Sequence, residues 1–250
     1  MKNIELSIKE MIESIKDYQY VSFDVFDTLI FRTVSSPDKI FDLAILEYQD
    51  KYGDYIETFK IKRQYAEHLS RKYYSREVSI DEIYEFLEFN DEVTNRFKQI
   101  EKSIEVKNCV PNPPMISVLN ECKKRGQKIV ITSDMYLTSD VFKDIFFKIG
   151  IAYDYLFISG EIRKTKWQGT IFPYLLNQLN IDCSQIVHVG DNTHSDILMP
   201  RKYDIHSMVR LQKETIKCES YCLKSSVVSD QLVQLYRNAI LGLGEVTPEF

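Results

Sequence analysis

Glycine and proline are scarce in this sequence, which has 8 Gly and 7 Pro among 250 residues. Long flexible or extended linkers are usually rich in one or both, so their scarcity argues against disordered stretches. Hydrophobic residues make up 44% and charged residues 28%, the balance of an ordinary globular protein. We therefore expect the whole chain to fold, either as one large domain or as a domain that carries an insertion.

Positive charge is also in short supply, since the formal net charge is -5 at pH 7. The chain thus lacks the basic field that would draw it to nucleic acid or to an anionic membrane, and we expect no nucleic-acid partner. No apolar run is long enough to span a bilayer. Charges interrupt the apolar positions of residues 1–20, which predicts an amphipathic helix and not a signal peptide. These features favour a cytoplasmic protein without a membrane span.

Cysteines are few, and they are scattered along the chain. An odd number at irregular spacing is typical of reduced thiols in the cytosol. The last two could share a helix face, but they have neither a second pair nor a nearby histidine to complete a metal site. We predict free thiols at all five positions: Cys109, Cys122, Cys183, Cys218 and Cys222.

Four short apolar runs, at residues 20–26, 128–134, 155–159 and 186–191, stand out in what the sequence does contain, and a weaker fifth covers 204–209. They lack strict alternation, which is the pattern of parallel strands buried on both faces. Helical patterns alternate with them from residue 115 onward. One helix is bounded by Pro113 and Gly126, and another by a cap at Ser139 and a stop at Gly150. The sequence predicts an α/β fold with a doubly wound, Rossmann-like parallel sheet of about five strands.

The interval between the first two strands is far longer than one crossover helix requires. Residues 34–110 contain four segments with apolar positions three and four apart, and Ser79 with Glu82 forms a capping box. We expect an inserted all-helical module there, in which Tyr and Phe side chains pack the helices together. The predicted organisation is an α/β core at 1–33 and 111–210, a helical cap at 34–110 and a C-terminal helical extension at 211–250.

Polar side chains follow each predicted strand at the point where it ends. Asp24 follows the first strand, Lys164 and Lys166 come after the third, and Asp191 and Asp196 follow the fourth; the second ends in Thr132, Ser133 and Asp134. The carboxyl ends of parallel strands meet at one edge of a sheet, so these groups should converge. Carboxylates, hydroxyls and an ammonium group suit phosphoryl transfer with a divalent cation. Helix capping would explain any one of the aspartates but not the whole set.

The same residues resemble the haloacid dehalogenase-like superfamily of Mg-dependent phosphohydrolases. The likeness runs from about Tyr20 to Ile205 and covers four motifs: "FDVFDTL", "ITSD", "SGEIRKTKWQGTIF" and "VGDNTHSD". The helical insertion is similar to the cap domain that closes over the site in that superfamily and selects the substrate. Three of these segments, extended as "FDVFDTLIFR", "SDMYL" and "HVGDNTHSD", also resemble a bacterial branch found with, or fused to, glycosyltransferases of surface-polysaccharide synthesis. That resemblance implies a possible glycosyltransferase partner and leaves the substrate undefined.

The resemblance implies a role for each motif residue. Asp24 would be the nucleophile that forms an aspartyl-phosphate, and Ser133 would bind the phosphoryl oxygens. The motif spacing favours Lys166 over Lys164 as the lysine that neutralises the reacting charges. The implied Mg²⁺ ligands are the carboxylates of Asp24, Asp191 and Asp196 and the backbone carbonyl of Phe26.

The first motif departs from the superfamily pattern. In its phosphatases a second aspartate, two positions after the nucleophile, protonates the leaving group, and here that position is Phe26. Asp27 stands one residue further on, and a one-residue slip redirects a side chain, so we expect a structural role for Asp27. General acid–base help is worth roughly 10²- to 10⁴-fold. A good leaving group, or a proton from His194 or from an insertion residue such as His68, Arg63 or Tyr65, would have to replace it.

We therefore expect a Mg²⁺-dependent phosphohydrolase or phosphotransferase that acts on a small phosphorylated metabolite, such as a sugar phosphate. Thr132 and Ser133 are small enough for close approach to the phosphate, and Arg32 and Arg63 are candidate anchors for a charged substrate. One alternative is a binding or accessory module of polysaccharide synthesis with little turnover. The other is a 2-haloacid dehalogenase, because those enzymes also lack the second aspartate. The two aspartates of "GDNTHSD" argue against it, since dehalogenases need no metal.

Overall fold

The structure is a computed structural model that describes residues 7–210, apart from the side chains of residues 49, 50, 52, 54, 56 and 57. At its centre lies a five-stranded sheet in which every neighbouring pair is parallel. The strand order is β5-β4-β1-β6-β7, which is doubly wound because the chain moves outward from β1 in both directions. This confirms the predicted fold class. The strands are β1 (Tyr20–Phe23), β4 (Lys128–Ser133), β5 (Tyr155–Ile158), β6 (Ile186–Gly190) and β7 (His206–Val209).

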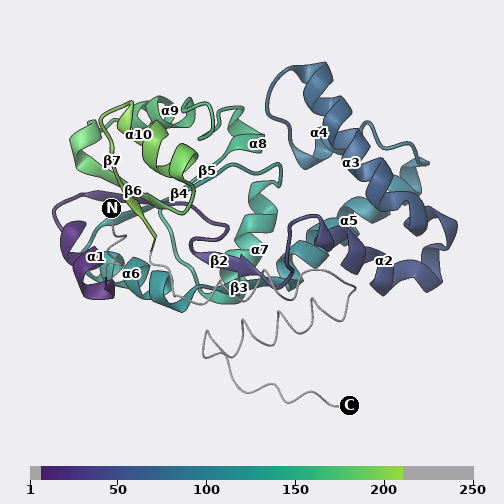
Figure 1. Ribbon diagram of the computed structural model, residues 1–250, viewed down its shortest axis with the longest axis horizontal. Helices are drawn as coiled ribbons and strands as arrows, with labels where there is room; N and C mark the ends of the chain where they lie inside the picture. The colour runs from purple at the N-terminus through teal and green to yellow at the C-terminus, as the bar shows by residue number, and fades with distance from the viewer. Residues whose placement is uncertain (1–6, 211–250) are drawn as a thin grey trace, which may run out of the picture.

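Helices cover both faces of the sheet, with α1 and α6 below it and α9 and α10 above it in the view of Figure 1. Alternate side chains of a strand enter different layers, so Val130 packs with Phe172 while its neighbour Ile131 belongs to the larger core cluster. The helices of this part are α1 (Ile8–Ser14), α6 (Pro113–Lys124), α7 (Ser139–Ile149), α8 (Ser159–Ile162), α9 (Ile171–Leu179) and α10 (Met199–Arg201), with a 3-10 helix at Cys183–Gln185 and a π-helix at Thr193–Leu198.

The predicted helix ends are confirmed at three of four positions. Pro113 begins α6, and Gly126 and Gly150 follow α6 and α7 with φ of 80° and 74°. The predicted cap at Ser139 is wrong by one residue, because Thr138 is the extended residue before α7. Its hydroxyl bonds Asp140 and caps no backbone N–H, while the Glu161 carboxylate accepts the Ser139 N–H at 2.7 Å.

Four helices form the insertion between β2 (Ile30–Arg32) and β3 (Cys109–Pro111), and we call them the helical insertion: α2 (Lys39–Tyr52), α3 (Asp54–Tyr74), α4 (Ile80–Tyr84) and α5 (Asp91–Lys107). They gather beside the sheet in Figure 1. The capping box is present, with Ser79 N–H donating to Glu82 Oε2 at 2.9 Å. The sequence did not predict β2 and β3, which are three residues each and pair antiparallel with Arg32 opposite Cys109.

Aromatic side chains pack the helical insertion together, as predicted. The rings of Phe59 and Phe97 lie 4.7 Å apart between α3 and α5, and Phe41 and Phe89 extend the cluster to α2 and to the segment before α5. Arg63 is fully buried among them and donates two hydrogen bonds to Glu101, at 2.7 and 2.8 Å. A fork of this kind is rigid, and it ties α3 to α5.

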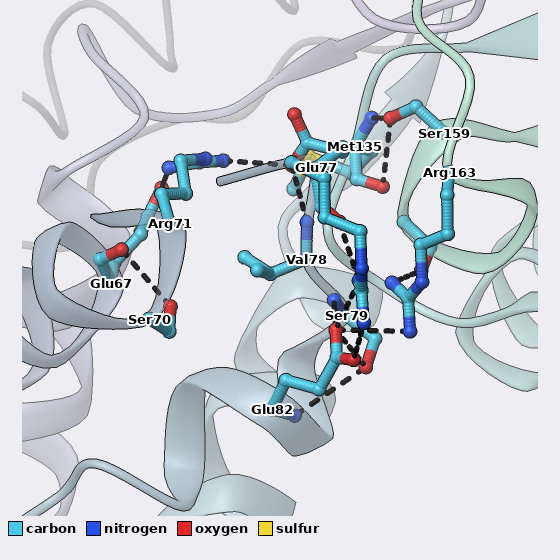
Figure 2. A network of polar contacts seen from close by, with 12 residues as sticks. Glu67, Ser70, Arg71, Glu77, Val78, Ser79, Glu82, Met135, Ser159 and Arg163 are labelled. Carbon is cyan, nitrogen blue, oxygen red and sulfur yellow. Dashed lines mark hydrogen bonds and ion pairs between the residues drawn. The ribbon is translucent and has the colours of Figure 1, made fainter. Parts of the chain in front are cut away.

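One place where the helical insertion touches the α/β core is the segment before and within α4 (Figure 2). Ile80 N–H donates to the Tyr136 carbonyl at 2.7 Å, and Arg163 pairs with Glu82 at 2.9 Å. Gly160 of the core lies so close to the insertion that an added Cβ would be 3.0 Å from the Val78 carbonyl oxygen. We call this set of contacts the insertion–core contact.

Three further predictions concern membrane-spanning helices, free cysteines and the C-terminal segment. Within residues 7–210 no helix combines the length and the hydropathy needed to cross a membrane. Cys109, Cys122 and Cys183 are free thiols, as predicted. The predicted C-terminal helical extension at 211–250, with Cys218 and Cys222, lies outside the described residues.

Candidate active site

Three carboxylates meet where β1 and β6 end. Asp24 directly follows β1, and its backbone N–H donates to the Val189 carbonyl at 2.9 Å, which ties it to the end of β6. Asp191 directly follows β6, and Asp196 lies in the π-helix that begins two residues later. Asp24, Asp191 and Asp196 each place one oxygen within 4.8 Å of the others. The structure thus brings together the three residues expected to bind a metal ion.

Lys166 lies among these carboxylates. Its Nζ is 2.5 Å from Asp24 Oδ1 and 2.6 Å from Asp196 Oδ1, and the side chain is 3% exposed. Lys164, the alternative of the sequence analysis, is exposed to solvent. Asp134 fixes the loop that carries Lys166, since its two oxygens accept the backbone N–H groups of Lys166 and Trp167 at 2.7 and 2.9 Å.

The charges of the group shift one another's pKa. Burial works against the charged form of Lys166, but Asp24 and Asp196 outweigh it and raise the pKa of the ammonium. Burial likewise opposes ionisation of Asp196, yet Lys166 and His188 hold the pKa of Asp196 well below its usual range. Burial raises the pKa of Asp24, and the Lys166 ammonium opposes that rise.

One charge of the group remains uncompensated. Burial and the neighbouring carboxylates of Asp24 and Asp196 raise the pKa of Asp191 to about 6. Asp24 Oδ2 is buried and has no hydrogen-bond partner among residues 7–210. A buried oxygen without a partner and a carboxylate that resists ionisation are both relieved by a hard divalent cation, which prefers carboxylate oxygens. The donor set therefore fits Mg²⁺.

The loop after β6 is built around Asp196. A Cβ on Gly190 would lie 2.3 Å from Asp196 Cγ, so only glycine leaves room for that carboxylate. The Asn192 N–H donates to Asp196 Oδ2 at 2.9 Å, and the Asn192 side chain accepts the N–H groups of His194 and Ser195. These bonds satisfy the first turn of the π-helix and fix where Asp196 stands.

The family comparison agrees with this geometry. Residues 18–204 match the family described as haloacid dehalogenase-like hydrolase. The chain belongs to the haloacid dehalogenase-like hydrolases. A search of curated proteins gave no significant match to this hydrolase.

Solved structures similar to the hydrolase include dehalogenases and one phosphatase. The 2-haloacid dehalogenase from Pseudomonas syringae pv. Tomato DC3000 is 15% identical, with 75% of this chain and 84% of that chain covered and a TM-score of 0.55. L-2-haloacid dehalogenase from Xanthobacter autotrophicus is 14% identical, with 89% and 88% covered and a TM-score of 0.52. A predicted phosphoglycolate phosphatase from Haemophilus somnus 129pt is 16% identical, with 77% and 84% covered and a TM-score of 0.49. At these identities the dehalogenase matches show a shared fold.

The two hydroxyl residues of β4 lie in different surroundings in the hydrolase. Ser133 is buried at the last position of β4. Thr132 is fully buried, and its hydroxyl hydrogen-bonds to Ser22 Oγ on β1 at 2.8 Å. The prediction that the Thr132 side chain binds substrate is therefore wrong, because this hydroxyl is committed to the interior of the sheet.

The two candidate anchor arginines are both paired within the hydrolase. Arg63 is fully buried and bonded to Glu101 and Glu67, so the prediction that it anchors substrate is wrong. Arg32 donates to Glu105 at 2.7 Å and lies over the ring of Phe26, with its Cζ 3.8 Å from the ring centroid. Arg32 thus lies against Phe26, the residue at which the first motif departs from the superfamily pattern.

Phe26 and Asp27 occupy different surroundings, as the shift in register predicted. The half-buried Phe26 ring meets Arg32 and the edge of Phe142. Asp27 is exposed and has a φ of 58°, a left-handed conformation that aspartate tolerates better than most residues. Its charge adds to the effects of burial and of the other carboxylates on the pKa of Asp191.

The other candidate proton donors make their contacts elsewhere or face solvent. His194 lies beside Trp167, with ring centroids 4.3 Å apart and its Nε2 3.0 Å from the Trp167 carbonyl oxygen. His68 and Tyr65 are exposed on α3. None of these contacts directs a proton donor toward Asp24.

Some residues that support the site were not predicted, or were given no role. Asp134 was expected at the end of the second strand, but its bond to the Lys166 loop was not predicted, and His188, which contacts Asp196, was missed. The signal for His188 was present, since it is the one polar residue of the apolar run "IVHVG". Arg210, next to the end of β7, was also missed, and the nearby charges of Asp191, Asp27 and Asp24 act on its pKa after the larger effect of burial, which lowers it.

Proposed function

We propose that the hydrolase is a Mg²⁺-dependent phosphohydrolase or phosphotransferase that acts on a small phosphorylated metabolite, with a sugar phosphate as the leading candidate. The observation that carries this proposal is a set of three carboxylates, two buried and one half-buried, of which two bond the same lysine. The ammonium does not balance three negative charges, and the charge of Arg210 only partly offsets the excess at Asp191. A divalent cation would balance this excess. The raised pKa of Asp191 supports the same conclusion.

The proposed ligands are the carboxylates of Asp24, Asp191 and Asp196 and the backbone carbonyl of Phe26. When bound, Mg²⁺ would offset the repulsion between the Asp24 carboxylate and a phosphate dianion. Side chains of the protein would carry out the other steps. We assign the Asp24 carboxylate as the nucleophile, because it directly follows the central strand β1 and is held by Lys166.

In the proposed reaction an Asp24 oxygen attacks phosphorus, and the bond between phosphorus and the leaving oxygen breaks to give an aspartyl-phosphate. Lys166 holds Asp24 Oδ1 and adds positive charge next to the reacting group. Water, or a second acceptor in a phosphotransferase, then takes the phosphoryl group and restores Asp24. We assign Ser133, at the end of β4, to the phosphoryl oxygens. The helical insertion would serve as the cap that selects the substrate.

The screen that tests this proposal measures phosphate release from a panel of phosphorylated metabolites, with Mg²⁺ and with EDTA. We expect turnover that needs the metal and falls to background in Asp24→Asn. Asp27→Asn is the matched control, since this neighbouring carboxylate is exposed and outside the group of three. Activity that is indifferent to both EDTA and Asp24→Asn would overturn the proposal.

A 2-haloacid dehalogenase is the second candidate. Phe26 supports it, because loss of a halide needs no general acid, and solved 2-haloacid dehalogenases share the fold. In that reaction an Asp24 oxygen would displace halide from carbon to form an ester, which water then hydrolyses. Halide release from 2-haloacids that persists in EDTA would favour this candidate over the phosphohydrolase.

A third proposal concerns partners. The motif likeness to the branch associated with glycosyltransferases suggests that the hydrolase works beside, or fused to, such an enzyme in surface-polysaccharide synthesis. It could act there as a module that binds a phosphorylated ligand and turns over slowly. Copurification of a glycosyltransferase with the full chain, together with phosphate binding and negligible turnover, would support this role.

A further inference from the structure

A layer of buried polar side chains crosses the centre of the sheet. Ser22 on β1, Thr132 on β4 and His188 on β6 lie on three adjacent strands and are all at most 1% exposed. Ser22 and His188 are directly opposite each other in the ladder. Burial of three polar groups in a sheet core costs free energy unless each one is hydrogen-bonded.

These side chains are bonded to one another in a single chain. Thr132 Oγ1 lies 2.8 Å from Ser22 Oγ, which lies 2.8 Å from His188 Nδ1. On the other side of the ring, His188 Nε2 lies 3.1 Å from Asp196 Oδ1. The chain therefore runs from the strand of the second motif to a carboxylate of the candidate metal site.

Donor and acceptor roles follow from its last member. Asp196 pairs with the Lys166 ammonium at 2.6 Å, so it is a carboxylate and can only accept. The contact at Asp196 Oδ1 is therefore a hydrogen bond in which His188 Nε2–H donates. On the other side of the ring, Nδ1 contacts the Ser22 hydroxyl, which also contacts Thr132, so the ring is held between Ser22 and Asp196. The polar layer thus presents an N–H to Asp196.

This N–H, which comes from strand β6, holds Asp196. Its Oδ1 receives Lys166 Nζ and His188 Nε2, while its Oδ2 receives the Asn192 N–H. Lys166 also binds Asp24, so it cannot by itself fix the orientation of Asp196. His188 belongs to the inner strand β6 and is itself held by Ser22, so it reaches Asp196 from a fixed position in the sheet.

We propose that His188 is a positioning residue for the cation site, and that its Nε2–H holds Asp196 in the orientation that lets it share a cation with Asp24 and Asp191. The proposal rests on the function proposed above. It also explains why this buried layer is polar. The fold alone does not require polar side chains there, since apolar side chains would pack without hydrogen bonds.

Two variants of His188 separate this role from a merely structural one. In His188→Gln the side-chain amide nitrogen reaches about as far as Nε2, so the bond to Asp196 is kept. In His188→Asn the amide reaches only about as far as Nδ1, so the contact with Ser22 is kept and the bond to Asp196 is lost. Both variants place an amide in the same buried site, and the melting temperature of the metal-free protein reports the cost to folding that they share.

The measurement is Mg²⁺ binding to the metal-free full chain by calorimetry, with Mn²⁺ binding followed by electron paramagnetic resonance as a second probe. Loss of a group that orients a metal ligand typically weakens binding by about 10- to 100-fold. We expect a loss of that size in His188→Asn and a much smaller one in His188→Gln. If both variants fold poorly, Ser22→Ala frees the ring without removing Nε2, and a several-fold loss is expected.

The outcomes also separate the two proposals. Mg²⁺ affinity that is equal in wild type, His188→Asn and Ser22→Ala would overturn the role of His188 and leave the proposed function intact. Wild-type protein that binds neither Mg²⁺ nor Mn²⁺ would overturn both.

Discussion

Phe26 is the residue that would most restrict the proposed phosphohydrolase. Its half-buried ring, covered by Arg32, stands where the motif likeness would place a general acid for the leaving oxygen. A leaving group that departs without a proton must be stable as an anion. The rate should therefore depend strongly on the pKa of the leaving alcohol.

We predict that the rate of phosphate release falls steeply across a series of aryl and alkyl phosphates as the leaving-group pKa rises. In Phe26→Asp the dependence should flatten, with a gain for alkyl phosphates toward the lower end of the roughly 10²- to 10⁴-fold that acid catalysis provides. The gain is limited because Arg32 would lower the pKa of the new carboxyl. Asp27→Asn is the control and should leave the slope unchanged, whereas a flat wild-type series would contradict the prediction.

Asp191 makes the stability of the metal-free protein depend on pH. Burial and the nearby carboxylates raise its pKa from 3.8 to about 6, so the folded state binds this proton more tightly than the unfolded state. The stability contributed by the proton is present below pH 4 and is lost as the pH rises through 6. Ionised Asp191 thus lowers the free energy of unfolding by about 1 kcal/mol at neutral pH, after allowance for solvent screening.

We predict that Asp191→Asn raises the melting temperature of metal-free protein at pH 7.5 and has much less effect at pH 4.5. Mg²⁺ should reverse the order at pH 7.5, because bound metal stabilises the wild type and not the variant. Differential scanning calorimetry in EDTA and in Mg²⁺ measures both effects. An equal gain at the two pH values would show that Asp191 is not the group responsible.

At the scale of elements, the buried Arg63–Glu101 pair joins α3 to α5. Removing one partner of a buried ion pair leaves the other charge uncompensated, at a cost of about 3–5 kcal/mol. We predict a loss of that size in the free energy of unfolding of Arg63→Met, measured with urea, and recovery of most of it in Arg63→Met/Glu101→Leu. Lys107→Met is the matched control, since its pair with Glu47 is exposed. A double variant no more stable than the single one would contradict this reading.

The observed strands and helices also show which parts of the fold can be predicted from the sequence. The five parallel strands were predictable because each is an apolar run that ends in a polar residue, and that same feature located Asp24, Ser133 and Asp191. β2 and β3 were not, because three residues carry no periodicity. The burial of Arg63 depends on Glu101, 38 residues away, and the bond between Ser22 and His188 depends on strand register. Neither distant relation can be read from one segment of a sequence.

At the scale of the whole molecule, Gly160 marks a point where the core and the helical insertion approach closely. A Cβ there would lie 2.7 Å from the Met135 carbonyl oxygen and 2.9 Å from Tyr136 Cα, both in the core, and 3.0 Å from the Val78 carbonyl oxygen in the insertion. All three atoms belong to the backbone, so the loop after β4 and the segment around Val78 would both have to shift. Overpacking of this kind typically costs about 1–3 kcal/mol.

We predict that Gly160→Ala lowers the melting temperature and makes the segment around Val78 easier to cleave by protease, because the insertion–core contact is opened. Arg163→Gln is the comparison variant. It removes the partly exposed pair with Glu82 without adding bulk, and its effect should stay below about 1 kcal/mol. Gly160→Ala that cleaves and melts like the wild type would show that the contact tolerates separation.

The pairing of β2 with β3 has a consequence for how such a molecule could be rebuilt. Arg32 and Cys109 are opposite each other in the ladder, and Thr33 N–H still donates to the Asn108 carbonyl at 2.9 Å. Opposite residues of an antiparallel pair have Cα atoms about 5 Å apart. The chain therefore leaves the α/β core and returns to it at nearly the same point. A two-residue turn could close that gap and make a hairpin, and helical modules of other lengths could be grafted there without disturbing the sheet. In this architecture the part that would choose the substrate is exchangeable, and the part that would carry out the chemistry is not.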